Sequence, residues 1–137
     1  MNILKPDAAN ASIGVSLVDG DADARHARQL MLRSENFNVR SYATRSALLA
    51  DARSRDFLCI VLDIEVNDLD AAAMLRKMRE TGWRGRAILL DDQGSEGEYL
   101  RDAERNGDQV MKRTIGDGAL VTAIVASVDR GWSGRNA

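Results

Sequence analysis

Residues 57–63 of the 137-residue chain read Phe-Leu-Cys-Ile-Val-Leu-Asp, an uncharged run that ends in a carboxylate. The run is too short for an ordinary helix, and its bulky and β-branched residues are typical of a strand buried on both faces. Strands of this kind occur in parallel sheets that helices cover on both sides. Because ligands bind at the carboxyl ends of such strands, Asp63 is predicted to lie at a functional edge of the sheet.

Four other segments are either apolar or alternate between apolar and polar residues, and each of them ends at polar residues. They are predicted as strands at residues 13–18, 37–42, 86–90 and 109–112, and a helical pattern follows every strand. Such alternation predicts an α/β fold with a five-stranded parallel sheet and helices on both faces. With right-handed crossovers the flavodoxin-like strand order 2-1-3-4-5 is favoured, which makes Asp19 and Asp63 neighbours.

The predicted helices carry apolar stripes and polar caps. The first is capped by Asp21 or Asp23, and its expected buried residues are Ala24, Ala27, Leu30 and Met31. Thr44 caps the second. The third is expected to bury Ala71, Met74, Leu75 and Met78, and the fifth to bury Leu120, Val121, Ile124, Val125 and Val128 before ending at Gly131. Trp83 and Trp132 are expected to be exposed.

Composition limits the classes of function. A formal net charge of −2, with no Lys/Arg-rich segment, argues against nucleic acid as a partner. No apolar run is long enough for a membrane helix, and the single Cys59 cannot form an internal disulfide. We expect a cytoplasmic protein with a flexible N-terminal arm at residues 1–12, one domain at residues 13–130 and a flexible tail at residues 131–137.

Four predicted strand ends deliver Asp19, Asp63, Asp91 and Lys112 to one edge of the sheet. Carboxylates gathered in this way suit a hard cation such as Mg²⁺, which takes oxygen ligands. A carboxylate can also accept a phosphoryl group, and a nearby lysine can neutralise the charge of the group transferred. The chemistry that this edge suggests is phosphorylation of an aspartate.

On these residues the chain, from about residue 13 to residue 128, resembles the receiver domains of two-component response regulators. The resemblance is carried by Leu17-Val18-Asp19, Val61-Leu62-Asp63-Ile64, Asp70-Ala71 and Met111-Lys112. It implies the (βα)5 receiver fold, Asp63 as phosphoacceptor, Lys112 as the neutralising cation, and Mg²⁺ held by Asp19, Asp63 and the backbone of Glu65. It also implies switch positions at Asp91 and Gln109.

The same resemblance implies partners and a mode of action. The expected partners are a histidine kinase or phosphotransfer protein and a downstream effector protein, and a homodimer could form through the face of the fourth helix, fifth strand and fifth helix. The implied role is a stand-alone signalling module that works through protein contacts and is not an enzyme.

Several positions depart from the family pattern. Gly20 replaces a second acidic residue, Asp91 a hydroxyl residue, Gln109 an aromatic residue and Arg113 a proline. A carboxylate at position 91 would repel an incoming phosphoryl group, and the loss of an acidic side chain at position 20 weakens the Mg²⁺ site. Phosphorylation of Asp63 and signalling without it both remain open, and these changes favour the second.

Two other classes of protein, a phosphohydrolase and a flavin-binding protein, match the sequence less well. A small phosphohydrolase with Asp63 as nucleophile would normally have a second aspartate two residues later, where this chain has Glu65. A flavin-binding flavodoxin relative would need a hydroxyl-rich phosphate loop at the first turn, which this chain lacks.

Overall fold

The computed structural model describes residues 13–65, 70–94 and 100–136, with side chains as far as Val128. The predicted N-terminal arm lies outside these residues. The chain forms one parallel sheet of five strands: β1 (Gly14–Val18), β2 (Asn38–Tyr42), β3 (Cys59–Asp63), β4 (Arg86–Asp91) and β5 (Gln109–Lys112). The strand order is β2-β1-β3-β4-β5, so the predicted α/β class and the 2-1-3-4-5 order are confirmed.

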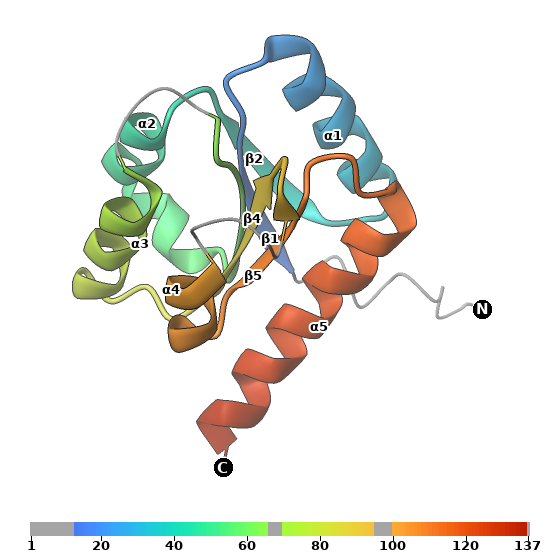
Figure 1. Cartoon of the computed structure of the whole chain (residues 1–137). Coiled ribbons are helices and arrows are strands. Elements are labelled where there is room, and N and C mark those ends of the chain that lie inside the picture. Colours follow the sequence, from blue (N-terminus) through green and yellow to red (C-terminus); the bar gives the residue numbers. More distant parts are fainter. Residues whose placement is uncertain (1–12, 66–69, 95–99, 137) are drawn as a thin grey trace.

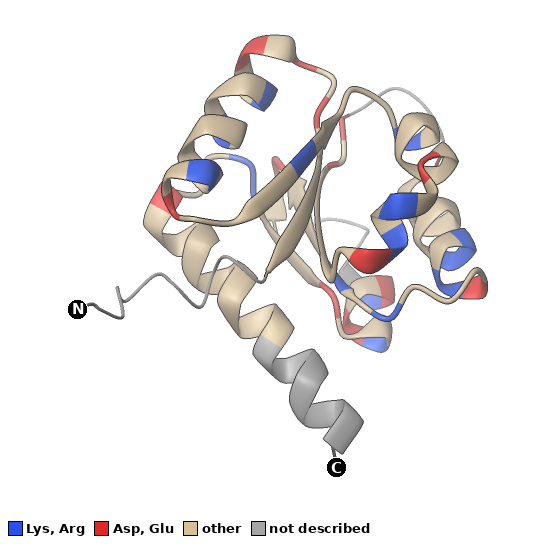
Figure 2. Ribbon diagram, turned by 180° about the vertical axis from the view of Figure 1, so that it is seen from behind, with Lys and Arg blue, Asp and Glu red and all other residues tan. Residues whose placement is uncertain are grey.

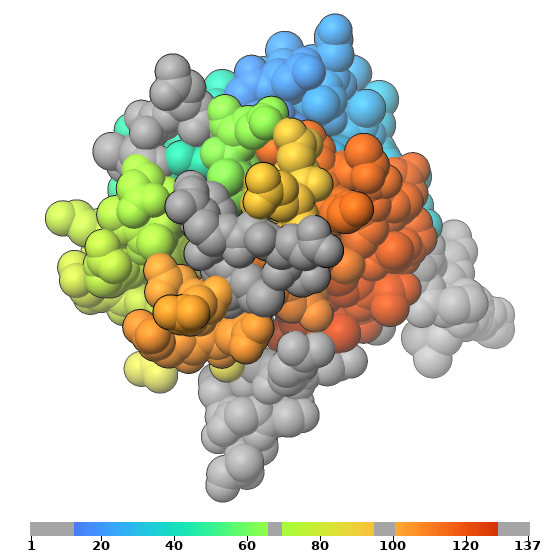
Figure 3. Space-filling model, viewed as in Figure 1, coloured from blue at the N-terminus to red at the C-terminus, as the bar shows by residue number. Residues whose placement is uncertain are grey.

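Helices cover both faces of this sheet (Figure 1). The α-helices are α1 (Ala22–Ser34), α2 (Arg45–Ala50), α3 (Ala71–Glu80), α4 (Leu100–Asn106) and α5 (Asp117–Asn136), and a 3₁₀ helix, η2 (Ala52–Asp56), follows α2. Helices α1 and α5 lie on one face, and α2, α3 and α4 lie on the other. In the space-filling view, blue α1 and red α5 form one flank of the molecule, opposite green and yellow α3 (Figure 3).

Strand β3 lies at the centre of the sheet and contributes to a hydrophobic core on each face. Ile60 and Leu62 belong to the cluster beneath α2, α3 and α4, whereas Cys59 and Val61 belong to the cluster beneath α1 and α5. All of these residues are fully buried, as the period of two along a strand requires when both faces are covered. The strand ends at Asp63, which places this carboxylate at the carboxyl edge of the sheet.

Most of the charged residues lie on helices and loops, while most residues of the sheet are uncharged (Figure 2). Helix α5 carries no charge between Gly118 and Val128 and packs Leu120, Ala123 and Ile124 into the core. Helix α3 buries Ala71, Met74, Leu75 and Met78, as predicted.

A buried ion pair connects α3 to strands β4 and β5. The side chain of Asp108, which has no exposed surface, accepts hydrogen bonds from Arg79 Nη2 at 2.7 Å and from the backbone N–H of Ala87 at 2.8 Å. The Arg79 guanidinium also lies 5.1 Å from the centre of the Trp83 ring. Asp108 therefore satisfies a cation and a buried backbone donor at once.

Three predictions about local structure were wrong. Helix α1 buries Leu32 and leaves Leu30 54% exposed, because the helix is rotated so that Arg28 instead faces the sheet edge. Trp83 is buried, since its indole N–H donates to the Phe57 carbonyl at 2.7 Å. Helix α5 continues past Gly131 to Asn136, because one glycine lowers helix stability by only about 1 kcal/mol and does not end a helix.

Candidate functional site

The site lies at the carboxyl edge of β1 and β3, which are adjacent in the sheet. Val18 pairs with Leu62 in the register, so the next residues, Asp19 and Asp63, emerge side by side. Both are almost completely buried, and they lie in an open cleft of about 430 Å³. Two carboxylates this close and this poorly hydrated need cations beside them to remain charged.

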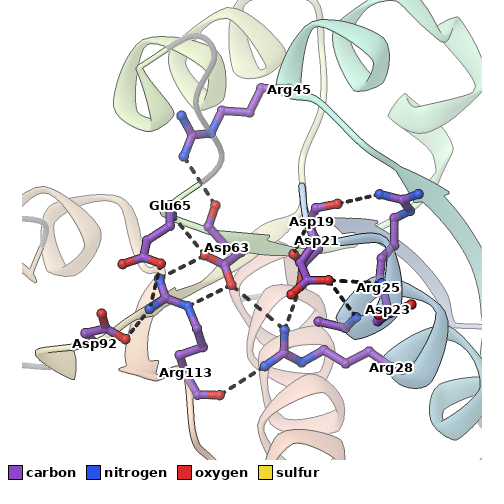
Figure 4. A network of polar contacts seen from close by, with 11 residues as sticks. Asp19, Asp21, Asp23, Arg25, Arg28, Arg45, Asp63, Glu65, Asp92 and Arg113 are labelled. Carbon is purple, nitrogen blue, oxygen red and sulfur yellow. Dashed lines mark hydrogen bonds and ion pairs between the residues drawn. The ribbon is translucent and has the colours of Figure 1, made fainter.

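Arg113 is the principal cation at Asp63 (Figure 4). Its Nε donates to Asp63 Oδ2 and its Nη2 to Asp63 Oδ1, each at 2.9 Å, which is the two-pronged geometry of a strong arginine–carboxylate pair. Its remaining group, Nη1, contacts Asp92 and lies 3.3 Å from Glu65 Oε1. Arg113, which follows β5, therefore connects the end of that strand to the ends of β3 and β4 through three carboxylates.

Arg28 of α1 is the second cation of the site. Its Nη1 donates to Asp19 Oδ2 at 2.9 Å and lies 4.0 Å from Asp63 Oδ2, between the two carboxylates. Its Nη2 donates to the backbone oxygen of Arg113 at 3.0 Å. We define Asp19, Arg28, Asp63 and Arg113 as the charge quartet.

Arg45 supports the quartet from beneath the turn that follows β3. Its Nη2 donates to the carbonyl oxygens of Asp63 at 3.3 Å and Ile64 at 2.7 Å, and the side chain is buried. On the other side of the turn, the Glu65 N–H donates to Asp63 Oδ1 at 2.9 Å. The backbone around Asp63 is thus held by Arg45 through two carbonyl oxygens.

The electrostatics follow from this crowding. Burial raises the pKa of the Asp19 carboxyl, and repulsion from Asp63 adds to the rise, while the Asp21 N–H and the Arg28 guanidinium act in the opposite direction. Hydrogen bonding to Asp63 raises the pKa of Arg113 still further above its usual value, so this residue is a permanent cation. Hydrogen bonding with Asp92 raises the pKa of Glu65.

The raised pKa of Asp19 should make the unfolding free energy depend on pH. Because the folded state holds the proton more tightly than the unfolded state, this group's contribution is fully present below pH 3.8 and is lost as the pH rises through the raised folded value. Lowering the pH from neutral toward 3.8 should therefore shift the difference in unfolding free energy between wild type and Asp19→Asn in favour of wild type. Denaturant unfolding at several pH values measures this; a constant difference would contradict it.

The predicted site residues are partly brought together. Asp19, Asp63 and Glu65 meet in the cleft. The Lys112 side chain is exposed and lies against Gly94, where an added Cβ would come 2.8 Å from Lys112 Cγ. In this structure the cation paired with Asp63 is therefore Arg113 and not Lys112, and the assignment of Lys112 to phosphoryl neutralisation stays a prediction.

The predicted switch positions lie at the two strands next to the site. Asp91 ends β4 and pairs with Lys112 in the register, and its carbonyl accepts from the Arg113 N–H at 3.1 Å. Gln109 begins β5 opposite Ile88, and its buried Oε1 has no hydrogen-bond partner among the residues that the structure describes. A switching role for either residue remains a prediction.

The residues of the cleft do not fit Mg²⁺ in this arrangement. Both oxygens of Asp63 and one of Asp19 accept hydrogen bonds from guanidinium groups, and the other Asp19 oxygen accepts from the Asp21 N–H at 2.9 Å. Gly20 adds no carboxylate. Across the described ranges, no group of three or more His, Cys, Asp or Glu side chains is placed to hold a metal ion.

The sequence analysis missed Arg28 and Arg113 as members of the site. One signal was present: Arg113 directly follows Lys112 at the end of a strand, and neighbouring residues there point to opposite faces. Either cation could therefore have been the one directed at Asp63. Arg28 had no such signal, because its role depends on the rotation of α1.

No protein-family profile and no curated protein sequence matches this chain. Among the described residues no helix has both the length and the apolar character needed to cross a membrane.

Solved structures match the chain in fold, and they are receiver domains. The signal receiver domain of a putative Luxo repressor protein from Vibrio parahaemolyticus has a TM-score of 0.75 at 15% identity, covering 90% of this chain and 95% of that one. The BeF3-activated DrrB receiver domain has a TM-score of 0.68 at 21% identity, covering 85% and 97%. The match in the CheX-CheY-BeF3-Mg²⁺ complex from Borrelia burgdorferi has a TM-score of 0.70 at 16% identity, covering 83% and 87%.

These neighbours define the class of fold. The strand order, the helices on both faces and the length of the matched region are those of CheY-like receiver domains. The chain therefore has the receiver fold, as its resemblance to that family implied. At identities of 15–21% the likeness is one of fold, and the function requires its own argument.

Proposed function

We propose that this chain is a receiver-like module of two-component signal transduction that acts through protein contacts while Asp63 remains unphosphorylated. The receiver fold supports the signalling class. The observation that carries the second part is the two-pronged pair between Arg113 and Asp63, since it occupies both oxygens of the carboxylate on which phosphorylation would depend.

Phosphoryl transfer to an aspartate requires a carboxylate oxygen that can attack phosphorus in line with the leaving group. In this chain each Asp63 oxygen accepts from Arg113 at 2.9 Å, and Oδ1 also accepts from the Glu65 N–H. A guanidinium in this position lowers the nucleophilicity of the carboxylate and fills the space that the phosphoryl group would need. The exposed carboxylates of Glu65 and Asp92 lie beside the same guanidinium and would repel a phosphoryl donor.

In this proposal the module recognises protein partners in the cytoplasm: a histidine kinase or phosphotransfer protein and a downstream effector. The face made by α4, β5 and α5 is the candidate surface, because β5 is the edge strand of the sheet and Val110, Met111, Val121 and Val125 are only half-buried. A second copy of the chain could use the same face to form a homodimer. A half-buried apolar surface of this kind is what a transient protein interface covers.

The proposal also includes the absence of enzymatic turnover. A phosphohydrolase that used Asp63 as nucleophile would have to release Arg113 in every cycle and would need an acid near the leaving group. The exposed Glu65 carboxyl of this cleft lies 3.3 Å from Arg113 Nη1 instead.

Phosphorylation can be tested directly on the purified chain. After incubation with Mg²⁺ and a small-molecule phosphodonor, we expect intact-mass measurement to show no added phosphoryl group on wild type, because Asp63 is paired with Arg113. A phosphorylatable receiver domain treated in parallel is the positive control. An adduct on wild type that disappears in Asp63→Asn would overturn the phosphate-independent mechanism.

A further inference from the structure

We propose that Arg28 and Arg113 together replace the divalent cation of this site, so that the intact module ignores divalent metals and its two carboxylates bind one only after both arginines are removed. This inference rests on the proposed function for the identity of the site. It goes further in assigning a positive role to two side chains, as positioning residues for Asp19 and Asp63.

All four side-chain oxygens of Asp19 and Asp63 accept hydrogen bonds. Asp63 Oδ1 and Oδ2 each accept from Arg113 at 2.9 Å, and Asp19 Oδ2 accepts from Arg28 at 2.9 Å. Asp19 Oδ1 accepts from the Asp21 N–H. Each of these four carboxylate oxygens already has a hydrogen-bond donor, and three of the four have a guanidinium (Figure 4).

The charges of the quartet balance. Asp19 and Asp63 bring two negative charges to a poorly hydrated place, and Arg28 and Arg113 bring two positive charges, the same total as one divalent ion. Arg28 Nη1 lies 2.9 Å from one carboxylate and 4.0 Å from the other, a position between the two that a bridging cation would take. The arginines thus neutralise the pair as a metal would.

The two guanidinium groups and a divalent metal ion cannot occupy the cleft together. Mg²⁺ binds oxygen ligands at about 2.0–2.1 Å and keeps several waters, so it needs both room and free oxygens. Both arginines line the same cleft as the two carboxylates. A metal placed there would meet two guanidinium cations at close range, and an arginine side chain does not lose its charge in a protein.

Mn²⁺ titration followed by electron paramagnetic resonance tests the inference, because bound and free Mn²⁺ give different signals. Wild type is expected to leave the free signal unchanged. Arg28→Ala/Arg113→Ala should bind Mn²⁺ at least tenfold more tightly than wild type, and adding Asp63→Asn should abolish that binding. Mn²⁺ should also raise the melting temperature of the double variant and leave that of wild type unchanged.

A matched control shows whether Mn²⁺ binding results from removing the two arginines of the cleft or only from lowering the positive charge of the protein. Arg76 and Arg101 are exposed arginines on α3 and α4, away from the cleft, and Arg76→Ala/Arg101→Ala changes the net charge by the same amount. This variant should bind Mn²⁺ no better than wild type. Arg28→Lys/Arg113→Lys, which keeps both charges, should likewise remain without the ion.

The outcomes are decisive even if the double variant does not fold. Saturable Mn²⁺ binding by wild type that is lost in Asp19→Asn overturns the inference. So does an Arg28→Ala variant that folds and gains Mn²⁺ binding at least tenfold tighter than wild type, since the inference requires both arginines to be removed and Arg113 still holds both oxygens of Asp63 in that variant. Mn²⁺ binding by unphosphorylated wild type would refute this inference alone, whereas metal-free phosphorylation of Asp63 would refute only the proposed function.

Discussion

Replacing Arg113 with alanine should lower the unfolding free energy by about 3 kcal/mol, which makes it one of the most damaging single changes we expect. Asp63 is 5% exposed and takes both of its side-chain ion-pair hydrogen bonds from Arg113. Removing the arginine leaves a buried carboxylate whose nearest described cation is Arg28 at 4.0 Å. The estimate lies at the lower end of the usual range for broken buried pairs because Arg113 itself is 20% exposed. Urea unfolding at neutral pH measures the loss.

Two companion variants show whether the loss comes from the stranded carboxylate. Asp63→Asn/Arg113→Ala removes the charge together with its partner and should recover more than half of the loss. Arg101→Ala, at an exposed arginine of α4, should change stability by less than about 0.5 kcal/mol. An Arg113→Ala variant as stable as wild type would mean that Asp63 is neutralised in another way.

Replacing Asp108 with alanine should also cost about 3 kcal/mol, for a different reason. The buried Asp108 carboxylate accepts from Arg79 and from the Ala87 N–H, so its loss strands a cation and a buried backbone donor together. Asp108→Asn keeps an acceptor for the Ala87 N–H and should cost roughly half as much. Thermal and urea unfolding of the two variants provide the comparison; equal losses would show that the charge alone matters.

The neighbourhood of Arg79 offers a further check on that interpretation. Arg79→Met removes the cation and retains a long side chain that can still lie against Trp83. It strands the Asp108 carboxylate, which has no exposed surface, and should therefore cost about 3 kcal/mol, as much as Asp108→Ala, although the Ala87 N–H keeps its partner. A loss below about 1 kcal/mol would show that the Asp108 carboxylate does not depend on Arg79.

The fold could be predicted because it depends on patterns of apolar and polar residues within short stretches of sequence. The apolar run at residues 57–63 identified the central strand, and the alternation of strands and helices led to the order β2-β1-β3-β4-β5. Helix α3 repeats its apolar residues at helical spacing, and all four that were predicted to be buried are buried. Each of these properties is encoded within a few residues of where it acts.

Only the acidic half of the site could be predicted from the sequence. The positions of its carboxylates follow from where the strands end, but the positions of its arginines do not. Asp19 and Asp63 come together through sheet topology alone. Arg28 reaches them only because α1 is rotated to bury Leu32 and expose Leu30, which the weak apolar pattern of this helix did not specify. Arg113 was assigned to the position of a proline in the family pattern, and position gives no information about where a long side chain points.

Trp83 was assigned to the surface for a similar reason. It lies in the turn after α3, where exposure is the usual outcome for a residue between elements. Its burial depends on a hydrogen bond to Phe57, which is 26 positions away in sequence. Contacts between such distant segments lie outside what a local pattern can predict.

The sequence distances within the charge quartet also affect how the chain folds. Arg113 is 50 positions from Asp63, and the hydrogen bond from Arg28 to the Arg113 carbonyl spans 85 positions. During synthesis the N-terminal part emerges first, so Asp19 and Asp63 are complete long before the strand that precedes Arg113. Nascent chains that end before β5 lack Arg113 and leave the buried Asp63 carboxylate without its paired cation, so we expect this domain to become stable only after Arg113 has been added.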